Sequence, residues 1–187
     1  MRIISGKYGG RKITMDEKAP VRPTSDKARG ALFSSVAAVI PGSRFLDVCA
    51  GTGAVGIEAL SRGALHVTAI EQSQRVVGLL RQNAGSLGID DSEFEILQGD
   101  FRRVLANMPG RTFDVIFIDP PYEQGLSHAA LEQVSGYGLL ADGGVMIVEH
   151  FAKEELPAAC AGLVQFKIRK YGQTVMTYYR KGEMADE

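Results

Sequence analysis

Asp119-Pro120-Pro121-Tyr122 carries the most specific chemical signal in the chain. Two successive prolines remove two backbone donors and fix two φ angles, so the segment is stiff and its carbonyl oxygens are free to accept hydrogen bonds. If Asp119 and the carbonyl of Pro120 each accept one N–H of a base amino group, the nitrogen lone pair can be directed at an activated methyl group. Tyr122 offers a ring on which the base can stack. We therefore predict that these four residues are catalytic, in methylation of an exocyclic amino group.

A glycine-rich segment, Gly51-Thr52-Gly53-Ala54-Val55-Gly56, follows a predicted strand and opens a predicted helix. Its glycines would let a ligand approach the backbone closely at the helix N-terminus. The spacing alone suits dinucleotides as well as S-adenosylmethionine, and Glu71, at the end of the second strand, suits ribose hydroxyls in either case. Asp47 favours S-adenosylmethionine, because a carboxylate there would attract the amino group of a methionine moiety and repel a pyrophosphate.

Asp100 follows the third predicted strand. Its carboxylate can accept a hydrogen bond from an adenine amino group, or cap the helix that follows, and the two roles are compatible. The ligand candidates thus lie at the carboxyl ends of successive parallel strands, where open α/β sheets place their clefts. The predicted cofactor-binding residues are Asp47, Ala50, Gly51, Thr52, Gly53, Glu71, Gln72, Asp100 and Phe101.

The elements that must position these residues alternate between short apolar runs and helical patterns, which is typical of an α/β fold. Nearly continuous apolar strands predict a parallel sheet that is buried on both faces. The predicted strands are 45–48, 67–70, 94–97, 113–118 and 145–148, and the predicted helices are 25–39, 55–62, 74–87, 101–108 and 126–134. One more short helix is expected after the fifth strand, followed by a terminal hairpin of 164–171 and 174–180 that contains an antiparallel strand. Residues 3–14 predict a small N-terminal hairpin.

Length and composition indicate a single domain, residues 1–187, with a hairpin and connector (1–24), a catalytic core (25–181) and a tail (182–187). Neither a membrane span nor a signal peptide is evident, so we expect a cytoplasmic protein that does not contact a membrane. The two cysteines form no CxxC pair, and with the three histidines they show no metal-ligand spacing. We predict no metal site, and expect Cys160 to pack within a helix.

Charge is distributed unevenly along the chain, although its net value is only -1. Residues 1–30 hold eight basic and three acidic residues, and residues 162–181 hold five basic residues and no acid, whereas 31–161 hold eight basic and sixteen acidic residues. Basic flanks favour a nucleic-acid partner, although the same side chains could be merely solvated. The predicted RNA-binding residues are Arg2, Lys7, Arg11, Lys12, Arg22 and Arg29.

The chain resembles the bacterial 16S ribosomal RNA (guanine-N2)-methyltransferases, which have the class I Rossmann-like methyltransferase fold. The likeness covers nearly the whole chain, and its family-specific parts are residues 1–12 and the Arg-Pro-Thr stretch from Arg22. It implies a seven-stranded sheet of order 3-2-1-4-5-7-6 with strand 7 antiparallel, helices on both faces, and an N-terminal hairpin that grips RNA. S-adenosylmethionine is the implied cofactor and S-adenosylhomocysteine the product. Val48 and Cys49 depart from the family pattern, which commonly has Leu-Phe there.

These observations together predict methyl transfer to N2 of one guanine in ribosomal RNA, within an unpaired loop or a small-subunit particle, by a monomeric enzyme. Three alternatives stay open at this point. Adenine-N6 methylation of DNA or RNA would use the same tetrapeptide, a catalytically silent RNA-binding assembly factor would need only the fold, and a nicotinamide-dependent oxidoreductase would use the glycine-rich segment.

Overall fold

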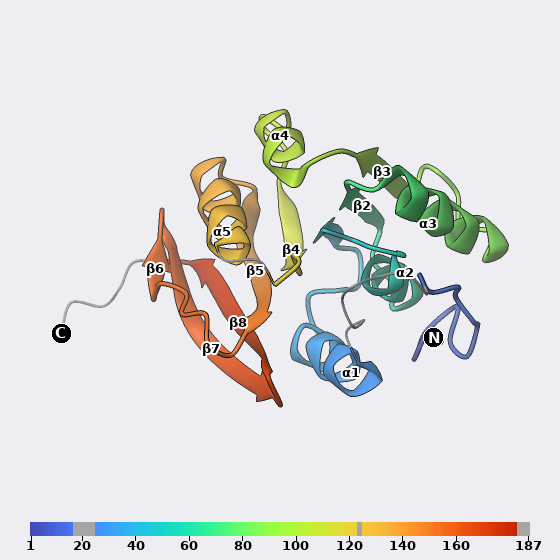
Figure 1. Ribbon diagram of the computed structural model, residues 1–187, viewed down its shortest axis with the longest axis horizontal. Helices are drawn as coiled ribbons and strands as arrows, with labels where there is room; N and C mark the ends of the chain where they lie inside the picture. The colour runs from blue at the N-terminus through green and yellow to red at the C-terminus, as the bar shows by residue number, and fades with distance from the viewer. Residues whose placement is uncertain (17–24, 123–124, 183–187) are drawn as a thin grey trace.

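One open sheet organises the computed structural model, which describes residues 1–16, 25–122 and 125–182 (Figure 1). Within these residues its strands are β1 (Arg44–Val48), β2 (His66–Glu71), β3 (Phe94–Gln98), β4 (Phe113–Ile118), β5 (Leu140–Phe151), β6 (Ala159–Cys160), β7 (Leu163–Tyr171) and β8 (Thr174–Lys181). The helices are α1 (Asp26–Ser35), α2 (Ala54–Ser61), α3 (Gln74–Ser86), α4 (Phe101–Ala106) and α5 (Leu126–Gly136).

The strand order is β3-β2-β1-β4-β5-β8-β7-β6. The first five strands pair in parallel, and β8 lies antiparallel between β5 and β7. Counted without β6, this is the predicted order 3-2-1-4-5-7-6, so the predicted fold class is confirmed. The strand count differs, because the described residues form eight strands rather than seven.

The additional strand is β6, which comprises only two residues and pairs with β7 at the sheet edge. A helix was expected here because alanines favour helices. Instead Ala159 pairs with Val164, and Gln165 donates its N–H to the carbonyl of Ala158 at 2.8 Å. The prediction that Cys160 packs within a helix is therefore wrong, since pairing with β7 overrides the local preference.

Helices cover both faces of the sheet, with α1, α2 and α3 on one face and α4 and α5 on the other (Figure 1). The strands contribute side chains to two apolar cores, one on each face of the sheet. In β4, for example, Val115 and Phe117 belong to the core on the α1 side, whereas Ile116 and Ile118 belong to the core on the α5 side. This alternation explains the continuous apolar runs of the sequence.

The N-terminal segment forms the predicted hairpin, closed by an antiparallel bridge between Arg2 and Lys12. Its apolar side chains, among them Ile3 and Ile13, are buried in the core on the α1 side. The hairpin is therefore packed onto the sheet domain. In the described residues, no helix is long and apolar enough to cross a membrane.

Candidate active site

A cavity of about 710 Å³ lies at the carboxyl ends of β1, β2, β3 and β4. Parallel strands place their carboxyl ends at one edge, so residues that are far apart in the sequence meet there. Eight of the nine predicted cofactor-binding residues line the cavity, and so do three residues of the predicted catalytic tetrapeptide. These are Asp47, Ala50, Gly51, Thr52, Glu71, Gln72, Asp100, Phe101, Asp119, Pro120 and Pro121.

Gly53 is the predicted cofactor-binding residue that does not line the cavity. It is the N-cap of α2 and has a φ of 83°, a left-handed conformation that is unfavourable for residues with a side chain. A Cβ at this position would also lie 3.0 Å from Cγ of Leu80. Gly53 therefore allows the sharp turn from β1 into α2, whereas Gly51 and its neighbours line the cavity.

Asp47 is buried at the end of β1, where its Oδ2 accepts a hydrogen bond from the backbone N–H of Gly56 at 2.9 Å. Burial raises the pKa of the Asp47 carboxyl to about 7, and the nearby charges of Asp119 and Glu71 raise it further, against the opposing effect of the Gly56 hydrogen bond. A cation in the cavity would relieve this penalty. The position therefore suits a positively charged ligand group.

Glu71 links two structural features of the site. Its Oε2 accepts from the backbone N–H of Gly51 at 2.9 Å, and its Oε1 accepts from the N–H of Ser73 at 2.8 Å. Ser73 is the N-cap of α3. Glu71 thus fixes the glycine-rich turn relative to the start of α3, and each carboxylate oxygen keeps a lone pair with which it can accept another hydrogen bond.

Asp100 is the N-cap of α4, where it accepts from the backbone N–H of Arg102 at 2.9 Å. The guanidinium of Arg102 also donates to both its oxygens, and these bonds lower the pKa of the Asp100 carboxyl to about 2. The capping role is therefore confirmed. Because Asp100 also lines the cavity, it is an ionised acceptor at its wall.

The first three residues of the tetrapeptide line the cavity, whereas the fourth lies on the surface beside it. Asp119 follows β4, and its backbone N–H donates to the carbonyl of Val48 at the end of β1, at 3.3 Å. Tyr122 does not line the cavity. Its ring lies 5.9 Å from that of Phe151, its hydroxyl is 3.2 Å from Oγ1 of Thr174, and the residue is 46% exposed. A partly exposed aromatic ring thus stands next to the cavity.

Cys49 is a cavity-lining residue that was not among the predicted site residues. It has a φ of 66°, a left-handed conformation that non-glycine residues seldom adopt. Burial, followed by the surrounding carboxylates, raises the pKa of its thiol well above the ordinary range. The thiol is therefore protonated and a weak nucleophile.

The N-terminal segment also contributes to the cavity, through Met1, Met15 and Asp16. Asp16 forms a two-bond ion pair with Arg75 of α3, with both N···O distances 2.6 Å. Asn83 of α3 binds the backbone of Thr14 through both ends of its amide, at 2.8 and 2.9 Å. Sequence reasoning missed these residues. Asn83 could have indicated these contacts, because it is a polar residue on the apolar face of α3 and a buried amide needs hydrogen-bond partners.

Arg29 does not fit its predicted role as a phosphate contact, because its side chain is completely buried. The guanidinium donates to the carbonyl of Arg2 and to the sulfur of Met1, and pairs with Asp26 at 3.1 Å. Glu58 of α2 lies 3.9 Å away. Arg29 joins α1 to the N-terminal segment, so its prediction as an RNA-binding residue is wrong.

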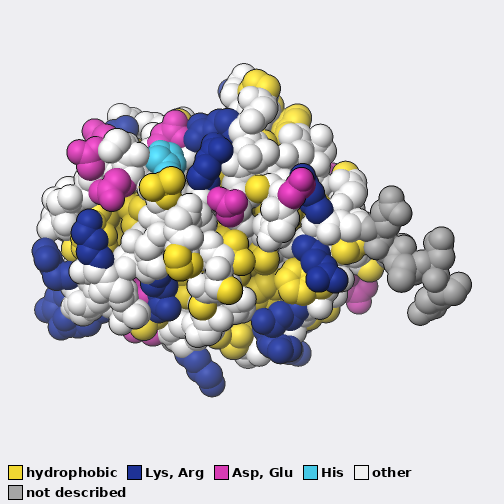
Figure 2. All heavy atoms as spheres, turned by 180° about the vertical axis from the view of Figure 1, so that it is seen from behind, with side chains coloured by type: hydrophobic (Ala, Val, Ile, Leu, Met, Phe, Trp, Pro, Cys, Tyr) yellow, Lys and Arg dark blue, Asp and Glu magenta, His cyan; other side chains and the backbone are white. Residues whose placement is uncertain are grey.

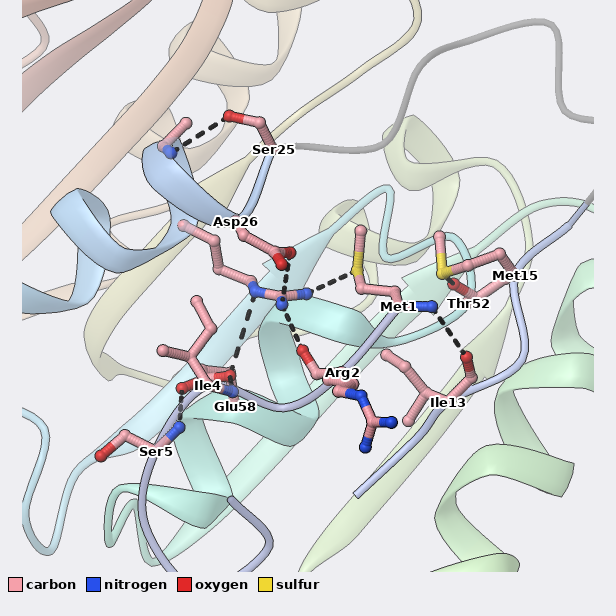
Figure 3. A network of polar contacts seen from close by, with 12 residues as sticks. Met1, Arg2, Ile4, Ser5, Ile13, Met15, Ser25, Asp26, Thr52 and Glu58 are labelled. Atoms are coloured by element: carbon pink, nitrogen blue, oxygen red, sulfur yellow. Dashed lines mark hydrogen bonds and ion pairs between the residues drawn. The ribbon is translucent and has the colours of Figure 1, made fainter. Parts of the chain in front are cut away.

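Glu58 is the second buried charge of this network (Figure 3). It accepts from the backbone N–H of Ile4 at 2.7 Å and of Ser5 at 3.1 Å, and pairs with Arg62 at 2.7 Å. The other predicted RNA-binding residues of the described segment, Arg2, Lys7, Arg11 and Lys12, are exposed. Arg22 lies outside the described residues.

Comparison with known proteins extends over nearly the whole chain. The family model described as "Conserved hypothetical protein 95" matches residues 1–180. Ribosomal RNA small subunit methyltransferase D of Escherichia coli (strain K12) is 32% identical over 181 residues, which are 97% of this chain and 90% of that protein. The protein of the same name from Haemophilus influenzae is 34% identical over 152 residues, 80% of this chain and 78% of the relative.

Solved structures agree with these relationships. The Escherichia coli protein yhhF has a TM-score of 0.86 and 31% identity, with 97% of each chain covered. A hypothetical protein of Thermus thermophilus has a TM-score of 0.82 and 29% identity, covering 96% of this chain and 99% of its own. Because the family model spans residues 1–180 and the Escherichia coli relative is 32% identical over 97% of this chain, the chain belongs to the Conserved hypothetical protein 95 family and is similar to ribosomal RNA small subunit methyltransferase D.

Proposed function

We propose that this protein transfers a methyl group from S-adenosylmethionine to the exocyclic N2 of a guanine in 16S ribosomal RNA. The observation that carries the proposal is the position of Asp119-Pro120-Pro121 on the wall of a cavity that the predicted cofactor ligands Asp47, Glu71 and Asp100 also line. The names of the relatives, ribosomal RNA small subunit methyltransferase D, support both the reaction class and the substrate.

The cavity fits the proposed cofactor in size and charge. Its volume of about 710 Å³ is within the range of small-molecule sites. S-adenosylmethionine, when bound, supplies an activated methyl group on a sulfonium cation. Asp47 would hold its amino group, Glu71 its ribose hydroxyls and Asp100 its adenine amino group, while Gly51 allows close approach of the backbone. The pyrophosphate of a nicotinamide dinucleotide would meet these carboxylates unfavourably.

Asp119 and the carbonyl of Pro120 would position the attacking amine. An exocyclic amino nitrogen is a poor nucleophile, because its lone pair is delocalised into the base. When its two N–H groups donate to Asp119 and Pro120, the nitrogen can pyramidalise and direct its lone pair at the methyl carbon. The carboxylate would then stabilise the positive charge that develops on the nitrogen as the N–C bond forms and the methyl–sulfur bond breaks. S-adenosylhomocysteine would be the leaving group, and the methylated nitrogen would release one proton.

RNA would reach the cavity past Tyr122, whose half-exposed ring supports a role in stacking against the target base. The base must leave any continuous stack to reach Asp119, so an unpaired loop within a small-subunit particle is a suitable substrate. Arg2, Lys7, Arg11 and Lys12 are exposed and would contact phosphates.

Methyl transfer in vitro tests this function. Small-subunit particles from cells that lack the protein are incubated with purified protein and S-adenosylmethionine labelled in the methyl group, and the RNA is digested to nucleosides. We expect labelled N2-methylguanosine. Labelled N6-methyladenosine would contradict the guanine assignment, whereas binding of NADH without binding of S-adenosylhomocysteine, measured by calorimetry, would contradict the reaction class.

A further inference from the structure

We infer that the face of the β7–β8 hairpin on the α1 side of the sheet is a docking surface for single-stranded RNA next to the target base. We call it the hairpin face and define it by Phe166, Lys167, Arg169, Tyr171 and Arg180. The inference rests on the proposed function and adds a surface that the N-terminal basic residues do not include.

Strand register places these side chains on one face. Across the ladder, Lys167 lies opposite Tyr178 and Arg169 lies opposite Met176. Directly opposite residues of an antiparallel pair point to the same face. Met176 and Tyr178 belong to the core on the α1 side, so Lys167 and Arg169 point to that side too.

A bulge between Gln165 and Lys167 adds an aromatic residue to this face. The ring of Phe166 meets that of Tyr178 edge-on at 6.2 Å, and the guanidinium of Arg180 lies 5.3 Å from the centre of the Phe166 ring. Phe166 is nevertheless 42% exposed. An accessible aromatic ring flanked by cations is thus available for base stacking.

Among the described residues, ion pairs neutralise only part of the charge of the hairpin. Residues 162–181 contain five basic residues and no acid. Lys181 pairs with Asp142 at 2.7 Å, but in the part of the chain that the structure describes Lys167, Arg169 and Arg180 form no ion pair. Figure 2 shows dark blue side chains around yellow ones in the area of the hairpin. Regularly spaced cations with an exposed aromatic ring match a phosphate backbone that carries unpaired bases.

The hairpin face is continuous with the catalytic segment. Thr174, the first residue of β8, contacts the hydroxyl of Tyr122 at 3.2 Å, and in the sheet it pairs with both Tyr171 and Phe151. At about 3.3 Å per residue, the strand from Thr174 to Arg180 extends roughly 20 Å, which spans several nucleotides. RNA whose target base stacks on Tyr122 would therefore continue along the hairpin face.

Two double variants test this surface. In the test variant, Lys167→Gln and Arg169→Gln remove two charges from the hairpin face but retain much of each aliphatic stem. In the matched control, Lys170→Gln and Lys181→Gln remove two charges from the same hairpin. Lys170 directly follows Arg169 in β7, so its side chain points to the opposite face of the sheet. Lys181 lies opposite Leu163, which belongs to the core on the α5 side, so Lys181 also points to that opposite face.

The measurement is the Kd for small-subunit particles from cells lacking the protein, as a function of salt concentration. We expect the test variant to bind on the order of tenfold more weakly at low salt, and the slope of log Kd against log salt to fall by about 1.4, since each contact to a single strand contributes about 0.7. The control should match the wild type, and all three proteins should bind S-adenosylhomocysteine equally. Equal losses in both variants, or none in the test variant, would overturn the inference. If the wild type neither binds nor methylates the particles, it is the proposed function that fails.

Discussion

At the scale of single residues, the carboxylates that line the cavity also accept hydrogen bonds from nearby backbone N–H groups. Asp47, Glu71 and Asp100 each accept a backbone N–H, from Gly56, from Gly51 and Ser73, and from Arg102. These bonds fix the carboxylates before any ligand arrives, which reduces the cost of ordering the site on binding. Their removal would therefore disturb both the fold of the turns and the affinity for the cofactor.

Asp119 permits a cleaner separation of catalysis from binding. We expect Asp119→Asn to lower kcat/KM for methyl transfer by about 10²–10³-fold, because the amide cannot stabilise the developing positive charge. The Kd for S-adenosylhomocysteine, measured by calorimetry, should stay near the wild-type value. Asp91→Asn changes an exposed carboxylate between α3 and β3 and serves as the control. Wild-type activity of Asp119→Asn would refute the proposed role.

Asp47 predicts a pH dependence of cofactor binding. Its pKa of about 7 means that below this pH the carboxyl is protonated in the free protein. A ligand ammonium group favours the carboxylate, so binding must first displace the proton, at a cost of up to about tenfold in Kd per pH unit. The affinity for S-adenosylhomocysteine should therefore rise from about pH 5.5 to about pH 7 and then level off.

Calorimetry in two buffers of different ionisation enthalpy would detect the released proton below pH 7. In Asp47→Asn both the proton release and this pH dependence should disappear, and binding should weaken. If the variant retained the wild-type pH profile, Asp47 would not be the group that contacts the ammonium.

The sequence was informative about residues at or just after the carboxyl ends of apolar strands, because these ends meet at one edge of a parallel sheet. This is why Asp47, Glu71, Asp100 and Asp119 were predicted together and lie together. Arg29 was assigned wrongly because a count of charges does not distinguish an exposed cation from one that pairs in the interior. Met15 carries no chemical signal in sequence and lines the cavity only through tertiary packing.

At the scale of elements, the N-terminal hairpin is held to α1 and α2 by a buried charged network. Glu58 is one of several anchors of the hairpin, together with Asn83 of α3 and the buried side chains of Ile3 and Ile13. The N-terminal segment also reaches the cavity through Met1 and Asp16, so the segment predicted to grip RNA adjoins the proposed cofactor site. Sequence patterns identified the hairpin but gave no indication of what it packs against, since these contacts join residues more than fifty positions apart.

Glu58→Ala should destabilise the protein strongly. It leaves the buried Arg29 without its α2 partner and removes the acceptor of two backbone N–H groups, which should lower the free energy of unfolding by about 3–5 kcal/mol. Urea unfolding measures the change. The control Glu132→Ala removes an exposed glutamate from α5 and should cost no more than about 0.5 kcal/mol. Equal values for the two variants would show that the network contributes little.

At the scale of the whole molecule, an acidic cavity adjoins basic surfaces from both ends of the chain. The acidic cavity suits a cationic cofactor, and the basic surfaces suit RNA. Alternation of strands and helices predicted the α/β class, the terminal hairpin pattern predicted an antiparallel strand, and the family resemblance supplied the strand order. The division into residues 1–24, 25–181 and 182–187 stays a prediction, because 17–24 and 183–187 lie outside the described residues.

Cofactor binding should stabilise the whole molecule, because the cavity joins four strands, several helices and the N-terminal segment. At a concentration of S-adenosylhomocysteine one hundred times its Kd, the free energy of unfolding should rise by about 2.7 kcal/mol. Denaturant unfolding with and without ligand measures this difference. NADH at the same concentration is the control, and stabilisation by NADH alone would indicate a different cofactor class.

The central claim is tested most directly by mapping N2-methylguanosine in the small-subunit ribosomal RNA of cells. Three strains are compared, one lacking the gene, one complemented with the wild type, and one complemented with Asp119→Asn. We predict that a single guanine loses its N2-methyl group on deletion, and that the wild type restores it whereas Asp119→Asn does not. An unchanged N2-methylguanosine map in the deletion strain would contradict the account.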